Sequence, residues 1–299
     1  MPPRPVTSRS PLLTLSGAPW DDFGLIDCGN GYKYERYGDY RFIRPEPQAL
    51  WAPSSDDWVA DGEFIPASDE DGGGRWHYTN VVPREGWTLG WDGVRFAAHC
   101  TPFRHLGFFP DMAPVWQWIR GQLAGRTDPQ FLNLFGYTGV GSLALAQSGA
   151  QVVHVDASKK AVAQARINAE LSGMTDAPVR WIVDDAVKFT GREVRRGRRY
   201  DAILLDPPKF GRGPDGELWK LEDDLPGLIA DCRQLLDDQS ACLFLTVYAV
   251  RMSALALREM LIQSLGDLGG VVEAGELAIV EEARGLELPT AIWARWSRP

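Results

Sequence analysis

From about residue 106 onward, apolar and polar positions follow two alternating patterns. Short, mostly apolar runs such as FLNLF (131–135) and QVVHVD (151–156) predict buried strands. The stretch SKKAVAQARINAELSG (158–173) has apolar residues three and four positions apart and ends at a glycine, which predicts a helix. Strands that alternate with helices build a parallel, doubly wound sheet, so we expect an α/β domain here.

The same patterns continue to the end of the chain. Further strands are expected at 179–185, 200–206, 241–250, 270–280 and 288–296, and further helices at 113–124, 141–149, 224–237 and 253–270. Ligands of such sheets bind at the carboxyl ends of the strands, close to the point where the strand order reverses. Candidate chemistry is therefore sought in the residues that directly follow each strand.

The first part of the chain has a different texture. It is rich in aromatic residues, and GYKYERYGDYRFIR (31–44) and GWTLGWDGVRFAAH (86–99) have the alternation and turn residues of β-hairpins. PASDEDGGGRWH (66–77) is expected to be an exposed loop. We predict an N-terminal β-rich domain over 1–105 and a second domain over 106–299. The aromatic residues either form the core of the first domain, which we favour, or stack on unpaired nucleobases for substrate recognition.

Charge and cysteine content narrow the class of protein. A net charge of −9 and a pI of about 5.0 argue against broad binding to nucleic acid, although a local basic groove is compatible with them. The four cysteines are far apart, which suits a reduced, cytoplasmic protein. The histidine spacing does not indicate a metal site. No run has the length of a signal peptide core or a membrane span, so no membrane partner is expected.

The turn after the first strand of the α/β domain is FGYTGVG, with Gly136, Gly139 and Gly141. Dinucleotide sites use the spacing G-x-G-x-x-G, whereas the spacing here is G-x-x-G-x-G. An NAD-dependent oxidoreductase is therefore disfavoured. The second strand ends on Asp156, where a carboxylate accepts hydrogen bonds from ribose hydroxyls in nucleoside cofactors. Taken alone, Asp156 would more often be a helix N-cap.

The third strand ends on Asp184, Asp185 and Ala186. A carboxylate there could accept from an adenine amino group, and alanine leaves room for the ring. A glycine turn, a ribose carboxylate and an adenine-side carboxylate, with no phosphate-binding loop, fit S-adenosylmethionine. This cofactor carries adenosine and an amino acid but no pyrophosphate.

The fourth strand ends in ILLDPPKFGRG, in which Asp206 is followed by two prolines. Prolines remove two backbone donors and fix φ near −65°, so we expect carbonyls that point outward without partners. A carboxylate beside bare carbonyls would accept hydrogen bonds from a planar amino group and favour positive charge on an attacking nitrogen.

These motifs together resemble the class I S-adenosylmethionine-dependent methyltransferases. FLNLFGYTGVGSLALAQSGAQVVHVDASKKAVAQARINAE, VDDAVKF and DAILLDPPKFGRG are most similar to the family of bacterial 23S rRNA large-subunit base methyltransferases. LGFFPDMAPVWQWIR (106–120) resembles the element that precedes the fold in that family. The resemblance covers roughly 106–299. It implies a Rossmann-like sheet of seven strands with the last one antiparallel, and S-adenosylmethionine as the methyl donor.

The resemblance also implies roles for the matching positions. The methionyl part of the cofactor would be lined by Phe135, Gly136, Tyr137, Thr138 and Gly139. The ribose would be held by Asp156, with Ala157 and Ser158 beside it, and the adenine would face Asp185 and Ala186. Asp111, Asn133 and Asp206 are also expected to bind the cofactor. The methyl-acceptor site would consist of Asp206, Pro207, Pro208 and Lys209.

Two positions depart from family members that methylate cytosine at C5, which need a cysteine nucleophile. Lys209 stands directly after the prolines, and Ala249 stands where the second usual cysteine would fall after the fifth strand. Cys242, at the start of that strand, is interpreted as a buried apolar residue. A nitrogen acceptor, which needs no covalent catalysis, fits the sequence better.

The leading hypothesis is a methyltransferase acting on a nitrogen of an RNA base, in ribosomal RNA. The alternatives are a methyltransferase for a small molecule or protein side chain, and a non-catalytic module that binds S-adenosylmethionine. REVRRGRR (192–199) is interpreted as a short solvated loop that could also contact phosphate.

Overall fold

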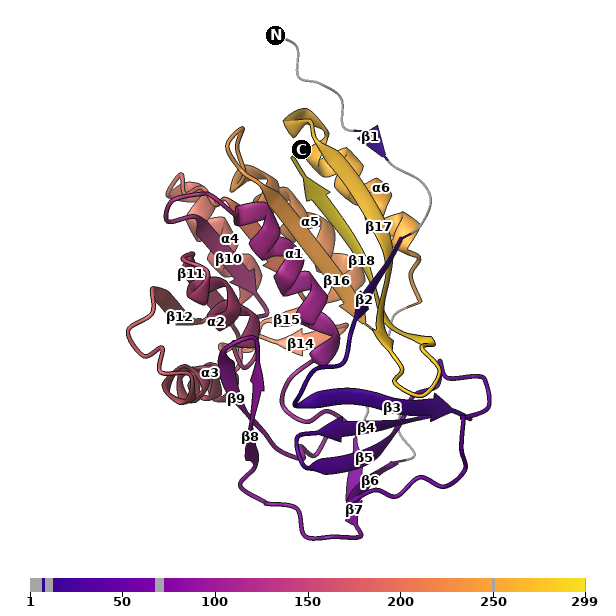
Figure 1. Ribbon diagram of the computed structural model, residues 1–299. Helices are drawn as coiled ribbons and strands as arrows, with labels where there is room; N and C mark the ends of the chain where they lie inside the picture. The colour runs from indigo at the N-terminus through magenta and orange to yellow at the C-terminus, as the bar shows by residue number, and fades with distance from the viewer. Residues whose placement is uncertain (1–6, 9–12, 68–72, 249–250, 299) are drawn as a thin grey trace. The chain divides into compact units, whose positions relative to one another are not determined.

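The computed structural model describes residues 7–8, 13–67, 73–248 and 251–298, which belong to two compact units (Figure 1). The α/β unit comprises Met1–Leu15, Pro114–Leu277 and Ala291–Pro299. The β unit comprises Ser16–Ala113 and Ala278–Thr290. This division differs from the predicted 1–105 and 106–299 in three segments. Residues 1–15 belong to the α/β unit, whereas 106–113 and 278–290 belong to the β unit.

A nine-stranded sheet runs through the α/β unit in the order β1-β17-β18-β16-β13-β10-β11-β12, with β2 also paired to β17. Its strands are β1 Thr7–Ser8, β2 Leu13–Gly17, β10 Gln130–Leu134, β11 Gln151–Asp156, β12 Val179–Val183, β13 Ala202–Leu205, β16 Cys242–Tyr248, β17 Val271–Val280 and β18 Glu287–Ser297. From β12 to β16 the strands are parallel, and β18 is antiparallel to β16. The predicted Rossmann-like sheet with an antiparallel last strand is confirmed, and β1 and β2 add two strands that the sequence did not indicate.

Six α-helices are assigned in the described residues: α1 Ala113–Leu123, α2 Val140–Gln147, α3 Lys159–Leu171, α4 Ala186–Arg195, α5 Leu221–Gln234 and α6 Ala254–Leu265. Strand β16 shows how they cover the sheet, because its successive side chains point to opposite faces. Leu243 and Leu245 join the core formed with α4, α5 and α6, whereas Phe244 contacts Trp118 of α1 at 5.4 Å between ring centroids. Figure 1 shows α1 on the opposite side of the sheet from α5 and α6. Among the described residues, no helix combines the length and the hydrophobicity that a bilayer span requires.

Helix α4 was not predicted, and the interpretation of 192–199 as a short loop is wrong for residues 192–195. The helix buries Ala186, Phe189, Thr190 and Glu193 on one side, and its other side carries arginines. Two of these four buried residues are polar, so the sequence of the segment resembles that of an exposed loop. The structure nevertheless packs it against α5.

The β unit contains a five-stranded sheet in the order β3-β4-β5-β6-β7 and a separate hairpin, β8-β9. The strands are β3 Phe23–Gly29, β4 Tyr32–Tyr37, β5 Tyr40–Pro45, β6 Gly62–Pro66, β7 Gly74–Tyr78, β8 Trp87–Trp91 and β9 Val94–Ala98. Both predicted hairpins are present, and the second closes on Asp92 and Gly93 with φ of 48° and 84°, as a two-residue turn requires. Residues 74–77 are strand rather than the expected exposed loop, because β7 pairs with β6, while 68–72 lie outside the described residues.

The aromatic residues of the β unit mostly contact one another. Tyr37 packs edge-on against Phe23, Phe42 and Phe108 with ring centroids 5.2–6.0 Å apart, and Phe42 also stacks on Trp87. This supports the interpretation that they form the core of their own unit.

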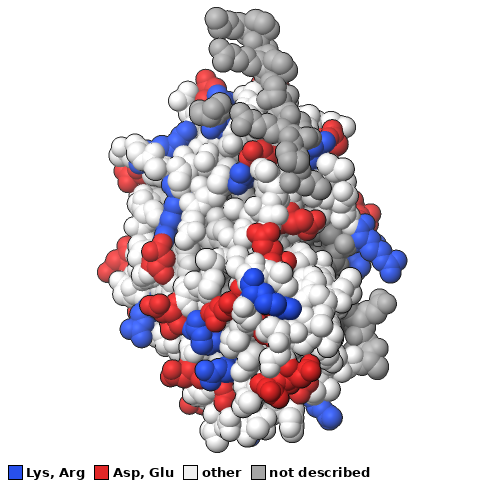
Figure 2. Space-filling view, turned by 45° about the vertical axis from the view of Figure 1, so that its right-hand side comes forward, with Lys and Arg blue, Asp and Glu red and all other residues white. Residues whose placement is uncertain are grey.

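On the face shown in Figure 2, basic and acidic side chains are interspersed.

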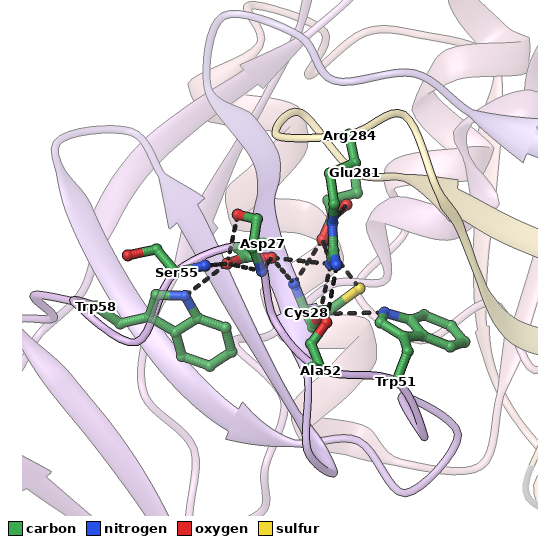
Figure 3. A network of polar contacts seen from close by, with 9 residues as sticks. Asp27, Cys28, Trp51, Ala52, Ser55, Trp58, Glu281 and Arg284 are labelled. Carbon is green, nitrogen blue, oxygen red and sulfur yellow. Dashed lines mark hydrogen bonds and ion pairs between the residues drawn. The ribbon is translucent and has the colours of Figure 1, made fainter.

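The hairpin tip between β17 and β18 belongs to the β unit because polar contacts tie it to β3 (Figure 3). Glu281 accepts a hydrogen bond from Cys28 N at 2.8 Å and from Arg284, which also reaches Asp27 at 3.1 Å. Leu25 and Glu281 form a parallel bridge. Contacts between residues more than 250 positions apart leave no local signature in the sequence, which is why the division at residue 105 did not include this segment.

Candidate cofactor and methyl-acceptor site

The turn after β10 comprises Phe135 to Gly139 and leads directly into α2. Phe135 and Tyr137 adopt positive φ angles of 57° and 49°, which are uncommon for residues with a side chain. Gly136 N donates to Val155 O at 3.0 Å, so the turn is fixed to the neighbouring strand β11. Such backbone strain, held by the surrounding structure, is typical of ligand sites.

Two glycines of the turn are explained by their neighbours. A Cβ atom on Gly136 would lie 2.4 Å from His154 Nδ1, and one on Gly139 would lie 2.7 Å from Ala165 Cβ. Gly139 also has a φ of 78° and caps the N-terminus of α2. These glycines allow the turn to lie directly on the side chains below it, a reason that differs from the ligand contact expected from the sequence.

A chain of buried polar side chains lies under the turn. Asn133 Nδ2 donates to Ser142 Oγ at 2.9 Å, and Ser142 Oγ lies 2.9 Å from His154 Nδ1. A hydroxyl has one proton and two lone pairs, so the tautomer of the His154 ring sets whether Ser142 Oγ donates to Nδ1 or accepts from it. Burial lowers the pKa of His154 to about 3, so the ring is neutral at physiological pH. Asn133, which was expected to bind the cofactor, is thus positioned to support the turn.

Asp156 stands at the end of β11 and is partly buried. Its Oδ2 accepts from Tyr137 N at 2.9 Å and its Oδ1 accepts from Ser158 N at 2.8 Å. Burial raises the pKa of this carboxyl, and the two backbone hydrogen bonds oppose that rise. Ser158 itself caps α3 by accepting from Ala161 N. The carboxylate therefore joins the turn to the start of α3 at the edge where a ribose was expected.

Asp185 caps the N-terminus of α4, and its Oδ1 accepts from Lys188 N at 2.9 Å. Ala186 is buried in the first turn of that helix. The neighbouring Asp184 N donates to Asp156 O at 3.1 Å, which joins the ends of β12 and β11. Asp184 also forms an ion pair with Arg192, so one arginine of the 192–199 segment has a structural role.

Asp206 directly follows β13, which pairs with β10 on the side opposite β11. Thr246 Oγ1, near the end of β16, donates to Asp206 Oδ1 at 2.6 Å and so orients the carboxylate. Pro207 is buried, whereas Pro208 and Lys209 are exposed. Sequence reasoning did not assign a role to Thr246, because it is 40 residues from Asp206 in the chain.

The expectation of bare carbonyls after Asp206 is wrong for two of the three residues. Trp219 Nε1 donates to Pro208 O at 2.7 Å, and Leu221 N donates to Lys209 O at 3.0 Å. Among the described residues, no hydrogen bond to the carbonyl oxygen of Pro207 is present. The candidate methyl-acceptor site is therefore smaller than the expected Asp206–Lys209. It comprises the Asp206 carboxylate and the Pro207 carbonyl, which we call the acceptor edge.

Trp219 belongs to a hairpin that the sequence did not reveal, formed by β14 Phe210–Arg212 and β15 Leu218–Lys220. Its indole ring is buried and lies 5.0 Å from the ring of Phe135. Trp219 thus contacts the turn at 135–139 through Phe135, and it contacts Pro208, which directly follows the acceptor edge. A tryptophan in this turn-rich stretch is the only sequence signal that could have indicated this role.

Asp111 is buried in the 3₁₀ helix η1 Pro110–Met112 of the β unit, so its assignment to the cofactor stays a prediction. Cys232 and Cys242 of the α/β unit are both fully buried, and burial raises the pKa of each thiol. Ala249 lies outside the described residues. No group of three or more potential metal ligands occurs in the part of the chain that the structure describes.

Comparison with solved structures supports the fold and the chemistry. A SAM-dependent methyltransferase from Agrobacterium tumefaciens is 44% identical, with a TM-score of 0.93 over 99% of this chain and 96% of that one. SMU.776 complexed with SAH is 17% identical, with a TM-score of 0.67 over 89% of this chain and 71% of that one, which shows the fold alone.

Curated relatives share a shorter region. A ribosomal RNA large subunit methyltransferase I from Aeromonas hydrophila is 41% identical over 119 residues, which is 40% of this chain and 29% of that protein. A ribosomal RNA large subunit methyltransferase K/L from Hahella chejuensis is 32% identical over 154 residues, 51% of this chain and 20% of that protein. The chain therefore spans less than a third of the length of these two relatives.

The family model that matches is that of the S-adenosylmethionine-dependent methyltransferases, over residues 65–236, which is more than half of the chain. The resemblance inferred from the strand-end motifs is confirmed, together with the methyl donor that it implied. The chain belongs to the S-adenosylmethionine-dependent methyltransferase family.

Proposed function

We propose that this methyltransferase transfers the methyl group of S-adenosylmethionine to a nitrogen of a base in ribosomal RNA. The observation that carries the nitrogen assignment is the acceptor edge, where Thr246 holds the Asp206 carboxylate beside the buried Pro207. The RNA assignment is supported by the relatives in Aeromonas hydrophila and Hahella chejuensis, which are named as ribosomal RNA large subunit methyltransferases.

The residues around the turn fit the methyl donor. Asp156 already binds two backbone N–H groups, yet burial keeps its pKa raised, so further donors such as two ribose hydroxyls would stabilise its charge. Asp185 presents a carboxylate beside the small side chain of Ala186, as an adenine with its amino group requires. The five residues from Phe135 to Gly139 would hold the methionyl part. When bound, S-adenosylmethionine supplies a methyl group on a positively charged sulfur, which leaves with the bonding electron pair.

The acceptor edge would orient the base rather than activate it covalently. Asp206 and the Pro207 carbonyl would accept hydrogen bonds from an amino group and so aim the nitrogen lone pair at the methyl carbon. The nitrogen gains positive charge as its bond to carbon forms, and a carboxylate stabilises that charge. The nitrogen then loses a proton, for which Asp206 is the nearest candidate acceptor.

Methylation of cytosine at C5 needs a thiolate that adds to the ring. The cysteines of the α/β unit, Cys232 and Cys242, are fully buried with raised pKa values, and Lys209 directly follows the prolines. These observations favour nitrogen over carbon as the acceptor.

The net charge of −9 favours the second candidate, a methyltransferase for a small molecule or a protein side chain. Methyl transfer with radiolabelled S-adenosylmethionine to in vitro transcribed large-subunit rRNA fragments distinguishes the two. We expect labelled RNA, and a nucleoside digest analysed by mass spectrometry should contain an N-methylated base. A C5-methylated pyrimidine would contradict the nitrogen assignment, and absence of label from every fragment would contradict the RNA assignment.

Three variants test the acceptor edge in the same assay. Asp206→Ala should lower kcat by about 100-fold or more, because an electrostatic contact to the reacting group is lost. Thr246→Val should lower kcat by roughly 10-fold with an unchanged Kd for S-adenosylhomocysteine, since only the orientation of Asp206 is relaxed. Asp238→Asn, an exposed carboxylate in the turn before β16, is the matched control and should retain full activity.

A further inference from the structure

The β14-β15 hairpin has two chemically different faces. In an antiparallel ribbon, residues that are paired across the strands point to the same side, and successive pairs alternate between sides. Gly211 pairs with Trp219, whereas the flanking pairs are Phe210 with Lys220 and Arg212 with Leu218. The first pair therefore defines an inner face, and the other four residues define an outer face.

The inner face is fixed to the proposed active site. Trp219 is buried, donates to Pro208 O at 2.7 Å and packs on Phe135. A Cβ on Gly211 would lie 3.5 Å from the Pro208 ring, so this residue also packs closely against Pro208. These contacts attach the inner face of the ribbon to Pro208 and Phe135.

The outer face exposes a large apolar surface next to cations. Phe210 is 59% exposed and Leu218, on the paired strand, is 57% exposed. Arg212 and Lys220 are exposed on the same face. Lys209 Nζ lies 5.3 Å from the centroid of the Phe210 ring.

Five carboxylates lie close to the hairpin in the chain: Asp215 and Glu217 at its tip, and Glu222, Asp223 and Asp224 in the first turn of α5. Glu217 and Asp215, at its tip, both pair with Lys188. Lys220 Nζ lies 3.6 Å from Asp223, in an exposed pair of the kind that contributes little. Within the described residues, Arg212 has no carboxylate within 4.0 Å. The outer face thus carries an exposed aromatic ring beside the cations Arg212 and Lys220, while the first turn of α5 next to it carries three carboxylates.

We propose that the outer face of the β14-β15 hairpin binds the single-stranded RNA that flanks the target base. One nucleobase stacks on Phe210, and the phosphates on either side contact Arg212 and Lys220. An exposed aromatic ring between cations is the arrangement that binds unpaired nucleotides, because every base has a face to stack and every linkage carries a charge. This inference rests on the proposed function, since it takes RNA as the substrate.

The test is the affinity of the protein, saturated with S-adenosylhomocysteine, for a fluorescein-labelled single-stranded RNA of about 12 nucleotides without self-complementarity. Phe210→Ala should weaken binding by roughly 10-fold without changing its salt dependence, because stacking involves no counterions. Phe210→Trp should restore the affinity. In Arg212→Ala/Lys220→Ala, the slope of log K against log salt should become shallower by about 0.7 for each lost phosphate contact.

Leu255→Ala and Lys160→Ala, which alter an exposed apolar residue of α6 and an exposed cation of α3, are the matched controls and should bind RNA like the wild type. Calorimetric titration with S-adenosylhomocysteine should be unchanged in all hairpin variants, which verifies that they are folded. If the wild type binds and methylates RNA but the hairpin variants bind it equally well, the hairpin proposal alone is overturned. If the wild type binds S-adenosylhomocysteine but neither binds nor methylates RNA, the proposed function fails and the hairpin proposal fails with it.

Discussion

Asp27 of the β unit and Asp156 of the α/β unit are both carboxylates in strands, but their surroundings differ. Asp27 is 2% exposed and accepts hydrogen bonds from Cys28 N, Ser55 N, Trp58 Nε1 and both donors of Ser54 (Figure 3). Asp156 is partly buried and accepts from two backbone N–H groups.

The pKa values of the two groups shift in opposite directions. Burial acts to raise the pKa of Asp27, but its hydrogen bonds hold that pKa well below the ordinary value. For Asp156 burial dominates and the pKa is raised. A carboxylate whose demand for donors is met within the protein is a structural element, whereas one that is partly buried with few donors gains most from a ligand. We therefore expect Asp27 to act mainly in folding and Asp156 mainly in binding a ligand.

The largest expected effect is on the β unit. Asp27→Asn should lower the free energy of unfolding by about 3 kcal/mol, because the amide cannot accept from all the donors that surround it and the Arg284 charge loses a partner. Urea denaturation followed by tryptophan fluorescence measures the loss, and hydrogen exchange of peptides from residues 23–58 assigns it to this unit. Asp56→Asn, which alters an exposed carboxylate in the loop that carries Ser54 and Ser55, should stay within about 0.5 kcal/mol of the wild type. Equal stability of Asp27→Asn and the wild type would mean that the hydrogen bonds to Asp27 do not stabilise the β unit.

The next largest expected effect is on ligand affinity and concerns Asp156. Asp156→Asn should raise the Kd for S-adenosylhomocysteine by roughly 30-fold, because charge-assisted hydrogen bonds to the ribose are lost. Its free energy of unfolding should change by less than that of Asp27→Asn. Calorimetric titration measures the affinity, and Asp176→Asn, an exposed carboxylate before β12, is the control. A variant that loses stability but keeps its affinity would assign Asp156 to the fold instead of the site.

The strands, and the carboxylates that end them, were readable from the sequence because both depend on local patterns. The apolar runs placed β10, β11, β12 and β13 to within a few residues, and a parallel sheet brings their carboxyl ends to one edge. Asp156, Asp185 and Asp206 were located at that edge for this reason.

The contacts that were missed join residues distant in the chain. Thr246 orients Asp206 across 40 positions, and Trp219 covers the Pro208 carbonyl that proline chemistry alone would leave bare. The reason for Gly136 was also hidden, because His154 lies below it in a different strand. Sequence patterns identify which residues reach the site edge, while the groups that support those residues depend on packing between elements.

The smallest expected effect concerns the buried, uncharged side chains of Asn133, Ser142 and His154, which lie under the turn at 135–139. His154 is fully buried, and its pKa of about 3 lies below the ordinary value near 6.5. Between these values the unfolded chain binds a proton that the native state does not, so His154 makes the free energy of unfolding decrease by up to about 1.4 kcal/mol per pH unit as the pH falls. The stability is present above pH 6.5 or so and is lost progressively below it.

His154→Asn keeps a polar group for Ser142 but has no titrating ring. The variant should be about 1 kcal/mol less stable than the wild type at neutral pH, and this difference should vanish near about pH 6 and reverse toward about pH 5, because the wild type alone loses roughly 2 kcal/mol over this range. Urea denaturation of both proteins across this range measures it, with His77→Asn, an exposed histidine of β7, as the control. Parallel pH profiles for the wild type and His154→Asn would mean that the ring is protonated in the fold. A cation would then lie directly below the turn that we assign to a positively charged methyl donor, which would oppose its binding, so the result bears on the site as well as on stability.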